Sequence, residues 1–229
     1  MLNCAAKDQR AHGLFQFYGA NRTGRWSSRM IQLQNLPQNH MKDLDLARSM
    51  VEKGDYGLIE MCYGNIPNVL SELIRTAFIA PEGKMFAVAD FSAIEARVLS
   101  WLAQEKWRLD VFNTHGKIYE ASASLMFGVP IEQVTKGSDL RQRGKTAELA
   151  LRYEGSVNAM EKMDKEKKLS KKEMYSIVAL WRRANPKIVE FWAEVNEKAI
   201  ECVQTRKTKK VSCLVFGHDG TNLPIALPA

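Results

Sequence analysis

The chain has 229 residues, of which 45% are hydrophobic and 26% charged, and it carries a formal net charge of +7. This composition is typical of a soluble globular protein with one large core or two modest ones. No apolar run approaches the roughly 18 to 20 residues that cross a bilayer, and the charged N-terminus excludes a signal peptide, so we expect a cytoplasmic protein. The four cysteines and four histidines form no Cys-x-x-Cys or His-x-x-x-His pair, which argues against a disulfide framework and a zinc site. The positive charge suits a polyanionic partner such as nucleic acid, and it equally suits a plain basic surface.

Local patterns in the N-terminal part predict a loop, a helix and a strand. Residues 1–37 are polar and rich in Arg and turn-forming residues, which predicts an extended loop. Residues 43–53 have the apolar spacing of a short amphipathic helix, with Gly54 as its stop. Residues 71–78 predict a helical turn that runs into a strand, and the apolar run 85–90 is the clearest predicted strand.

The remainder is mainly helical in pattern. A helix after Asp90 is expected to bury a stripe formed by Ile94, Val98, Trp101 and Leu102. Further helices are predicted over 119–127 and from Ser138 past Tyr153. A capping box of Ser170 and Glu173 starts another helix, and the last begins at Pro186. The buried stripe expected on this last helix is Ile188, Phe191, Trp192, Val195 and Ala199. The mixed-charge run 161–173 predicts a solvated helix end and turn. The tail predicts a strand, a turn at Asp219-Gly220 and a second strand, so the fold class is α+β.

Two acidic residues at the strand-to-helix junction have different interpretations. Ser92-x-x-Glu95 ahead of an apolar-periodic helix is itself a capping box, which gives Glu95 a structural role. Asp90 has no such explanation, because an acid that ends a buried strand is costly unless it is paired, binds a metal or opens into a cleft. Metal-assisted nucleotidyl transfer uses such an acid, since Mg²⁺ prefers carboxylate oxygen. A lone aspartate leaves these alternatives open.

A second group of residues follows a helical spacing of four. Arg141, Lys145, Leu149 and Tyr153 share one face of the predicted helix. A triphosphate laid along that face would meet two cations first and then a flat ring suited to a base. An amphipathic surface helix with scattered basic residues would show the same pattern. Arg143 and Arg152 lie off this face and are expected to contact solvent or backbone.

The loop sequence TGRWSS lies among Arg22, Arg25 and Arg29. Gly and Ser let a backbone approach a phosphate chain closely, while Arg side chains reach into a groove. Because Arg-rich loops are common, this segment indicates a DNA contact only in combination with other signals.

Taken in chain order, the segments together resemble the family A, polymerase-I-like DNA polymerases of phage and prophage type. NRTGRWSSRMIQLQNLPQ resembles the family segment TGR-x-S-S…LQN-[IL]-P. RTAFIAPEG and VADFSAIEARVLSWLA resemble the lead-in and motif A, D-[YF]-S-x-I-E-x-R-x-x-A, and GKIYEASASLMFGVP resembles the helix that follows. RQRGKTAELALRYEGS resembles motif B, R-x(3)-K-x(7)-Y-G. The resemblance extends from about Phe17 to the end of the chain.

The resemblance implies a role for each matching residue around the incoming nucleotide. The Asp90 side chain and the Phe91 carbonyl would contact Mg²⁺, of which the family uses two ions. Glu95 would act as a steric gate that excludes a ribose 2′-OH. The residues implied to contact the dNTP on the helical face are Arg141 and Lys145 at the triphosphate, Leu149 at the sugar, and Tyr153 at the nascent base pair.

The resemblance also implies contacts with DNA and a supporting contact. Arg25, Gln34 and Asn35 would contact the minor groove of the primer-template duplex, and Arg97 would hold neighbouring carboxylates in place. Neither a membrane nor a protein partner is expected, and the location would be the cytoplasm of a bacterial or phage-infected cell.

The sequence departs from the family pattern at several positions. Leu149 replaces a Phe or Tyr, Glu154 replaces the Gly after the tyrosine, and Tyr119 replaces a His. The family's second catalytic carboxylate lies in a His-Asp-Glu hairpin, whereas Gly220 follows His218-Asp219 here, so Asp219 is expected to be a turn residue rather than a metal ligand. The chain is therefore expected to be a fragment that catalyses little or nothing by itself.

The expected organisation is part of a polymerase palm sheet with a mainly helical fingers subdomain. Residues 1–130 would be partial palm with the thumb-junction loop and motif A, 131–205 helical fingers with motif B, and 206–229 a palm β-hairpin. The expected function of the parent is DNA-templated DNA synthesis. Two alternatives stay open: a non-catalytic DNA-binding module, and a relative of single-subunit RNA polymerases, against which Glu95 argues.

Overall fold

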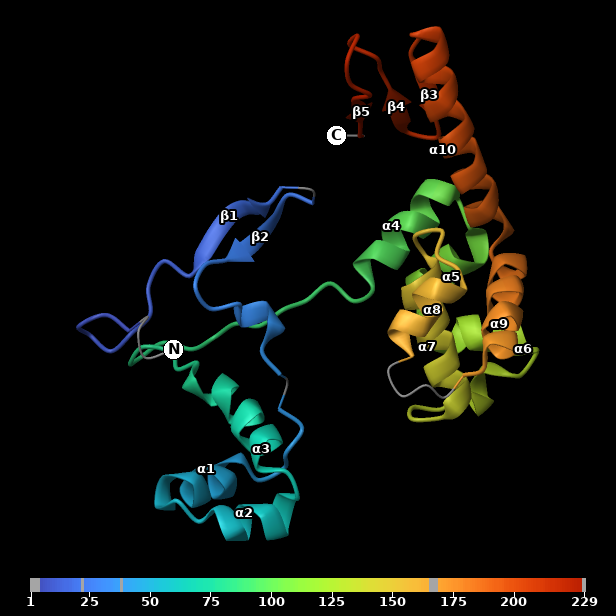
Figure 1. Ribbon diagram of the computed structural model, residues 1–229. Helices are drawn as coiled ribbons and strands as arrows, with labels where there is room; N and C mark the ends of the chain where they lie inside the picture. The colour runs from blue at the N-terminus through green and yellow to red at the C-terminus, as the bar shows by residue number, and fades with distance from the viewer. Residues whose placement is uncertain (1–4, 22, 38, 165–168, 228–229) are drawn as a thin grey trace. The chain divides into compact units, whose positions relative to one another are not determined.

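The structure is a computed structural model that describes residues 5–21, 23–37, 39–164 and 169–227. Its contacts divide the chain into two compact units, Met1–Val88 and Ala89–Ala229 (Figure 1). Helices dominate, and the strands form two small antiparallel sheets. The α+β class is confirmed, while the three-part division at residues 130 and 205 stays a prediction.

The first unit begins with a β-hairpin where an extended loop was predicted. Strands β1 (Phe15–Ala20) and β2 (Arg25–Ser28) pair antiparallel. Gly24 adopts a φ of +64°, a conformation that glycine reaches without steric cost and that lets the chain reverse. Phe17 and Trp26 then pack across the pair with ring centroids 5.2 Å apart. The loop prediction is wrong. The turn residues are present, but the contact between the Phe17 and Trp26 rings accompanies strand pairing on either side of the turn.

Helices complete the first unit. They are η2 (Leu33–Asn35), α1 (Leu44–Lys53), α2 (Tyr56–Tyr63), α3 (Ile66–Leu73) and η3 (Ile74–Ala77). Helix α1 and its left-handed stop at Gly54 are confirmed. Helix α2 and the first part of α3 were not predicted, although Asp55 and Asn65 cap the two helices by accepting hydrogen bonds from Leu58 N and Asn68 N. The helical turn predicted from residue 71 is confirmed by the end of α3 and by η3. A small core of Ala47, Met50, Ile59 and Val69 holds the helices together.

The strand predicted at 85–90 is absent. Residues 84–92 form no helix or strand and are exposed, with Met85 and Val88 89% and 92% accessible. The strand predicted near residue 78 is also wrong, because α3 continues into η3 there. A strand is stable when a neighbour takes its backbone hydrogen bonds. Among the described strands none pairs with this segment, so its apolar sequence alone does not order it.

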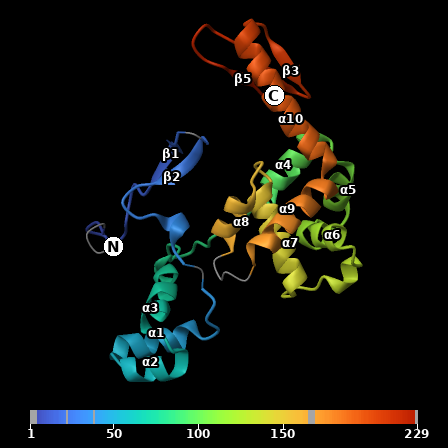
Figure 2. The ribbon, with the colours of Figure 1, turned by 45° about the vertical axis from the view of Figure 1, so that its right-hand side comes forward.

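The second unit is a helical bundle with a small sheet at one end. Its helices are α4 (Ile94–Ala103), α5 (Lys106–Thr114), α6 (Ile118–Phe127), η4 (Ile131–Gln133), α7 (Asp139–Leu151), α8 (Val157–Met163), α9 (Lys171–Ala184) and α10 (Pro186–Thr205). Helix α7 packs against α6, α8 and α9 (Figures 1 and 2). The central core contains Met126, Ala147, Leu151, Met160, Ile177, Trp181 and Ile188. Helix α7 is therefore the buried centre of this unit.

Local end signals are confirmed in this unit. Gly128 ends α6 in a left-handed conformation, and Ser170 with Glu173 forms the predicted capping box at α9. Hydrogen bonds from the Ser170 backbone and side chain lower the pKa of Glu173. Asn185 separates α9 from α10, which starts at Pro186. Part of the 161–173 charge run, residues 165–168, lies outside the described residues.

Helix α7 ends earlier than predicted. Its last residue is Leu151, so Tyr153 lies just beyond the helix and is exposed. Glu154 has a φ of +58°, which favours glycine, so this departure from the family pattern leaves a non-glycine residue in the left-handed region. At Gly155 a Cβ would lie 2.0 Å from Ala150 O, because the chain turns tightly across the helix end.

The buried face of α4 is also different from the predicted stripe. Ala96, Ser100 and Ala103 are buried, whereas Ile94, Val98 and Trp101 are about half exposed. Of the predicted stripe, Leu102 alone is partly buried and packs against the core under the C-terminal sheet. Helix α4 packs against α5 and α10. The small side chains allow this close approach, so size rather than hydrophobicity selected the buried face.

The C-terminal strands form a three-stranded antiparallel sheet in the order β3-β4-β5 on α10. Their bounds are β3 (Lys209–Val211), β4 (Leu214–Phe216) and β5 (Ile225–Ala226). The first predicted strand is instead the β3–β4 hairpin, which turns at Ser212 with a φ of +51°. Asp219 and Gly220 lie in the β4–β5 connection, as the predicted turn requires. Cys62, Cys202 and Cys213 are free thiols, and in the described part of the chain no helix is long and apolar enough to span a membrane.

Candidate functional site

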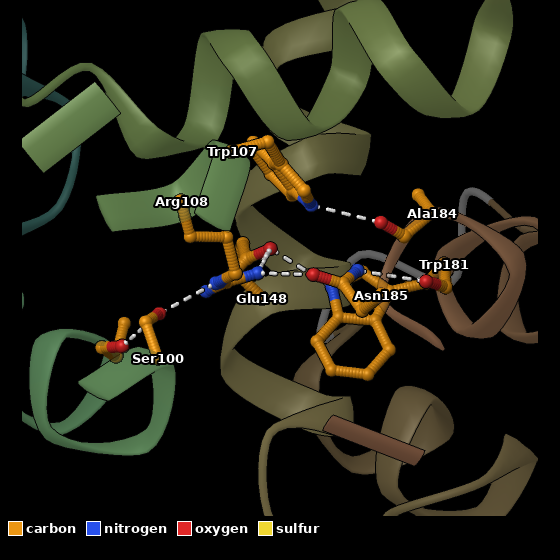
Figure 3. Close-up of polar contacts among 8 residues, drawn as sticks. Ser100, Trp107, Arg108, Glu148, Trp181, Ala184 and Asn185 are labelled. Atoms are coloured by element: carbon orange, nitrogen blue, oxygen red, sulfur yellow. Dashed lines mark hydrogen bonds and ion pairs between the residues drawn. The ribbon is translucent and has the colours of Figure 1, made fainter. Parts of the chain in front are cut away.

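A buried ion pair anchors α7 to α5 (Figure 3). Arg108 is fully buried and Glu148 is 2% exposed. The two Arg108 Nη atoms donate to the two Glu148 carboxylate oxygens at 2.9 and 2.5 Å. Two parallel charge-assisted bonds define direction as well as distance, so this pair sets the rotation of α7 about its own axis.

Other helices complete the network around this pair. Arg108 Nε donates to Ser100 Oγ at 2.8 Å, and Arg108 Nη1 donates to Asn185 Oδ1 at 2.9 Å. Trp181 Nε1 donates to Glu148 Oε1 at 2.8 Å, and Asn185 Nδ2 donates to Trp181 O at 2.7 Å. Elements α4, α5, α7, α9 and the start of α10 thus meet at one satisfied polar centre.

Sequence reasoning missed this network. The available signal was the position of Glu148, which shares a helical face with the buried Gly144, Ala147 and Leu151. A charged residue on an apolar face indicates a buried partner. The partner Arg108 lies 40 residues away, and no local pattern identifies it.

The predicted nucleotide face of α7 is partly buried. Arg141, Lys145 and Leu149 are half-buried. Arg141 Nε donates to Glu120 Oε1 at 2.6 Å, and the Arg141 guanidinium lies 5.7 Å from the centroid of the Tyr119 ring. Burial is the largest single effect and raises the pKa of Glu120, but the hydrogen bond and charge of Arg141, a backbone hydrogen bond and the charge of Lys117 together lower this pKa on balance. Within the described ranges Lys145 has no hydrogen-bond or ion-pair partner, which leaves its ammonium available for a ligand.

An open cavity lies beside Arg141. Its volume is about 210 Å³, and Ser92, Ala93, Gly116, Lys117, Ile118, Tyr119, Glu120 and Arg141 line it. The loop before α4 and the start of α6 therefore meet α7 here. Two cations and one carboxylate give the cavity a net positive lining that suits a phosphate group.

Helix α6 and helix α7 approach closely next to this cavity. A Cβ on Gly144 would lie 2.5 Å from Tyr119 O and 2.9 Å from Ala123 Cβ. Replacing a helical Gly by Ala gains about 1 kcal/mol in propensity, whereas overpacking against backbone costs about 1 to 3 kcal/mol. The net of the two effects is a destabilisation of up to about 2 kcal/mol for Gly144→Ala, measured by urea unfolding followed by Trp fluorescence. Gly57→Ala in α2 is the control, because nothing lies within 4 Å there; a stable Gly144→Ala protein would mean that the helices separate easily.

Glu95 and Tyr153 are brought together through Arg152. The helix-capping interpretation of Glu95 is wrong, because Ala93 precedes α4 without a side-chain cap and Glu95 forms an ion pair with Arg152 Nη2. The Arg152 guanidinium lies 5.1 Å from the centroid of the Tyr153 ring. The expectation that Arg152 contacts solvent or backbone is therefore wrong.

Two other arginines also differ from expectation. Arg143 forms ion pairs with Asp139 at 2.7 Å and Glu173 at 3.3 Å, rather than contacting solvent or backbone. Arg97 was expected to hold carboxylates, but its Nε donates to Ser92 O at 3.0 Å and its guanidinium lies 4.5 Å from the centroid of the Phe112 ring. Arg97 thus links the first turn of α4 to the loop before it through the Ser92 carbonyl.

Asp90 and Phe91 lie in the exposed segment before α4. The Asp90 carboxylate and the Phe91 carbonyl offer adjacent hard oxygen donors, which fit one Mg²⁺ ion held mainly by substrate phosphates. No cluster of three metal-binding side chains occurs within the described ranges. These donors fit one ion and lack the carboxylates for a pair of ions.

The Asp219 side chain forms hydrogen bonds within its own turn. Its carboxylate accepts hydrogen bonds from Asn222 N at 2.7 Å, Thr221 N at 3.0 Å and Asn222 Nδ2 at 3.2 Å. These backbone hydrogen bonds, led by that from Asn222, lower the pKa of Asp219 to about 2. The bonds agree with the predicted turn role.

The predicted DNA contacts belong to the first unit. Arg25 is on β2, and Gln34 and Asn35 are in η2. Ser28 Oγ of β2 donates to Gln34 Oε1 at 2.5 Å, and Asn35 Nδ2 donates to Gln32 Oε1 at 2.6 Å. The bond from Ser28 ties η2 to the hairpin that carries Arg25.

Comparison with known proteins decides the family. The model of DNA polymerase family A matches residues 1–213. The chain belongs to DNA polymerase family A. A DNA polymerase of Bacillus phage SP02 is 55% identical over 231 residues, covering 100% of this chain and 36% of the phage protein. The thermostable DNA polymerase I of Thermus aquaticus is 33% identical over 126 residues, or 54% of this chain and 14% of that protein.

The fold agrees with the family. A solved structure of the POL domain of Pol1 from M. smegmatis, in complex with DNA primer-template and dNTP, has a TM-score of 0.59 and 24% identity. The match covers 92% of this chain and 31% of that one. The chain thus spans about a third of the length of the phage SP02 polymerase and of the M. smegmatis POL domain. Family A DNA polymerases generally use a divalent metal ion.

Proposed function

We propose that this chain forms the nucleotide-binding part of a DNA-templated DNA polymerase. The reaction joins a dNMP to a primer 3′-OH with loss of pyrophosphate. The supporting observation is the contact of Glu95 with Arg152, which brings the motif A glutamate beside the motif B residues Arg152 and Tyr153. Family membership and a positively lined cavity at Arg141 agree with a nucleotide ligand.

Each part of the nucleotide has a candidate partner in the second unit. Lys145 and Arg141 would bind the triphosphate, and Arg141 would exchange its bond to Glu120 for a phosphate oxygen. Glu95 would lie against the sugar, Leu149 beside it, and Tyr153 under the base pair. Arg97 would support this region through the Ser92 carbonyl.

The template side and the metal complete the proposal. Arg25, Gln34 and Asn35 would contact primer-template DNA from the minor groove. Asp90 and the Phe91 carbonyl would hold Mg²⁺, which supplies charge stabilisation at the phosphates when bound. The proposed division is partial palm in 1–130, fingers in 131–205 and a palm hairpin in 206–229. We propose that the carboxylate that would hold a second metal ion is not among residues 1–229.

Template-directed nucleotide selection tests the function. The chain is mixed with primer-template duplexes that differ only in the templating base, and the affinity for each dNTP and single-nucleotide incorporation are measured with Mg²⁺. We expect the complementary dNTP to bind most tightly for each template. Duplex binding with no effect of the templating base on dNTP affinity would instead indicate a DNA-binding module, and a preference for ribonucleotides would indicate an RNA polymerase relative.

Lys145 gives a residue-level prediction. Lys145→Ala is expected to weaken dNTP binding about tenfold or more, since a charge-assisted bond contributes about 1.5 to 3 kcal/mol, and to leave duplex affinity nearly unchanged. Fluorescence titration with each ligand measures both affinities. Lys172→Ala removes the same charge from an exposed position in α9 and serves as the control. Equal losses for dNTP and duplex would assign Lys145 to the general basic surface.

A further inference from the structure

The ion pair between Glu95 and Arg152 joins the first turn of α4 to the residue after α7. The two side chains are only 25% and 20% exposed. Solvent and salt screen such a pair less than a fully exposed one. The pair therefore defines the position of the Glu95 carboxylate more firmly than a surface contact would.

Arg152 is itself held in place. Its guanidinium lies beside the Tyr153 ring, and the following residues turn tightly across the end of α7. Arg152 Nε is buried with no hydrogen-bond partner among the described residues. The contact of Arg152 Nη2 with Glu95 therefore fixes the orientation of the guanidinium. A planar guanidinium offers donors in a fixed geometry, which an ammonium cannot reproduce.

An unpaired glutamate at this position would behave differently. Its rotatable side chain would sample several rotamers, and its free oxygens could accept a hydrogen bond from a sugar hydroxyl. The ion pair with Arg152 occupies Oε2 and restricts the rotamers that the Glu95 side chain can adopt. The carboxylate is then held in one position and adapts less readily to a sugar hydroxyl.

We propose that Arg152 is a positioning residue that sets the preference for deoxyribonucleotides over ribonucleotides by holding Glu95 against the sugar. The inference rests on the proposed function, in which Glu95 contacts the nucleotide. Arg152 acts on the 2′ position through Glu95 and needs no contact with the substrate.

The test compares dATP and ATP on a duplex with a templating thymine. Affinities are measured for the full chain and for Arg152→Met, Arg152→Lys, Glu95→Ala and the double variant Arg152→Met/Glu95→Ala. We expect Arg152→Met to lower the dATP/ATP affinity ratio about tenfold, and Arg152→Lys to fall between it and the wild type. In the double variant the ratio should equal that of Glu95→Ala alone, since Arg152 then has nothing to position.

Other results would overturn the inference. Equal losses of dATP and ATP affinity in Arg152→Met would mean that Arg152 only stabilises the fold, and the proposed function would stand. Circular dichroism checks that each variant folds. If Arg152→Met does not fold, the dATP/ATP affinity ratio of Arg152→Lys provides the test. Template-independent dATP binding by the wild type would contradict the proposed function itself.

Discussion

Glu148→Ala is expected to lower the free energy of unfolding of the Ala89–Ala229 unit by about 3 to 5 kcal/mol. The substitution leaves the guanidinium of Arg108 buried without its carboxylate, and it also removes the acceptor of Trp181 Nε1. A buried charge without a partner is strongly destabilising, because its desolvation is no longer compensated. A change of that size would populate the unfolded state measurably in a domain of ordinary stability.

Urea unfolding followed by Trp fluorescence measures this change. Glu190→Ala is the matched control, because Glu190 pairs with Lys187 in an exposed position where solvent screens the attraction, so its loss should change stability little. The double variant Arg108→Met/Glu148→Leu should recover stability relative to Glu148→Ala, since an apolar pair leaves no unpaired charge. A loss below about 1 kcal/mol for Glu148→Ala would mean that water reaches Arg108.

Asp90→Asn is expected to reduce by about 100-fold or more whatever Mg²⁺-dependent single-nucleotide incorporation the chain supports. In the proposed contact the Asp90 carboxylate is a ligand of the metal ion. The metal ion stabilises the negative charge of the transition state by several kcal/mol, so loss of this ligand should slow the reaction. The variant should also weaken Mn²⁺ binding in the presence of dNTP, measured by electron spin resonance. This second measurement applies whatever the incorporation rate of the chain.

Asp219→Asn separates the two candidate carboxylates. The Asp219 carboxylate accepts hydrogen bonds from Thr221 and Asn222 within its own turn. Its replacement should therefore leave Mn²⁺ binding unchanged and loosen the β4–β5 connection. Loss of Mn²⁺ binding in Asp219→Asn but not in Asp90→Asn would make Asp219 the ligand. Full incorporation by Asp90→Asn would mean that Asp90 does not hold the catalytic metal, whereas duplex binding with no incorporation by either protein would favour a DNA-binding module without chemistry.

Elements with local signals could be predicted from the sequence. Helix α1 with its stop at Gly54, α6 with Gly128, and the capping box of Ser170 and Glu173 depend on residues within a few positions of one another. The motif segments identify the family for a similar reason, because each is a short run whose residue types and spacing are visible in one chain.

Features that depend on distant partners could not be predicted. The segment 85–90 has a strand sequence, yet whether it forms a strand depends on a neighbouring strand. The buried face of α4 follows from how closely α5 and α10 approach, which selected Ala96 and Ser100 over larger apolar residues.

The same distinction applies to the candidate site. The sequence by itself determined which residue types are present at the motif positions and which helices carry them. Only the tertiary structure decided that Glu148 pairs with Arg108 and that Glu95 pairs with Arg152 rather than capping its own helix. A charge in a partly or fully buried place requires an opposite charge or hydrogen-bond partner, and the chain supplies that partner from wherever packing brings it, which spacing along the sequence does not encode.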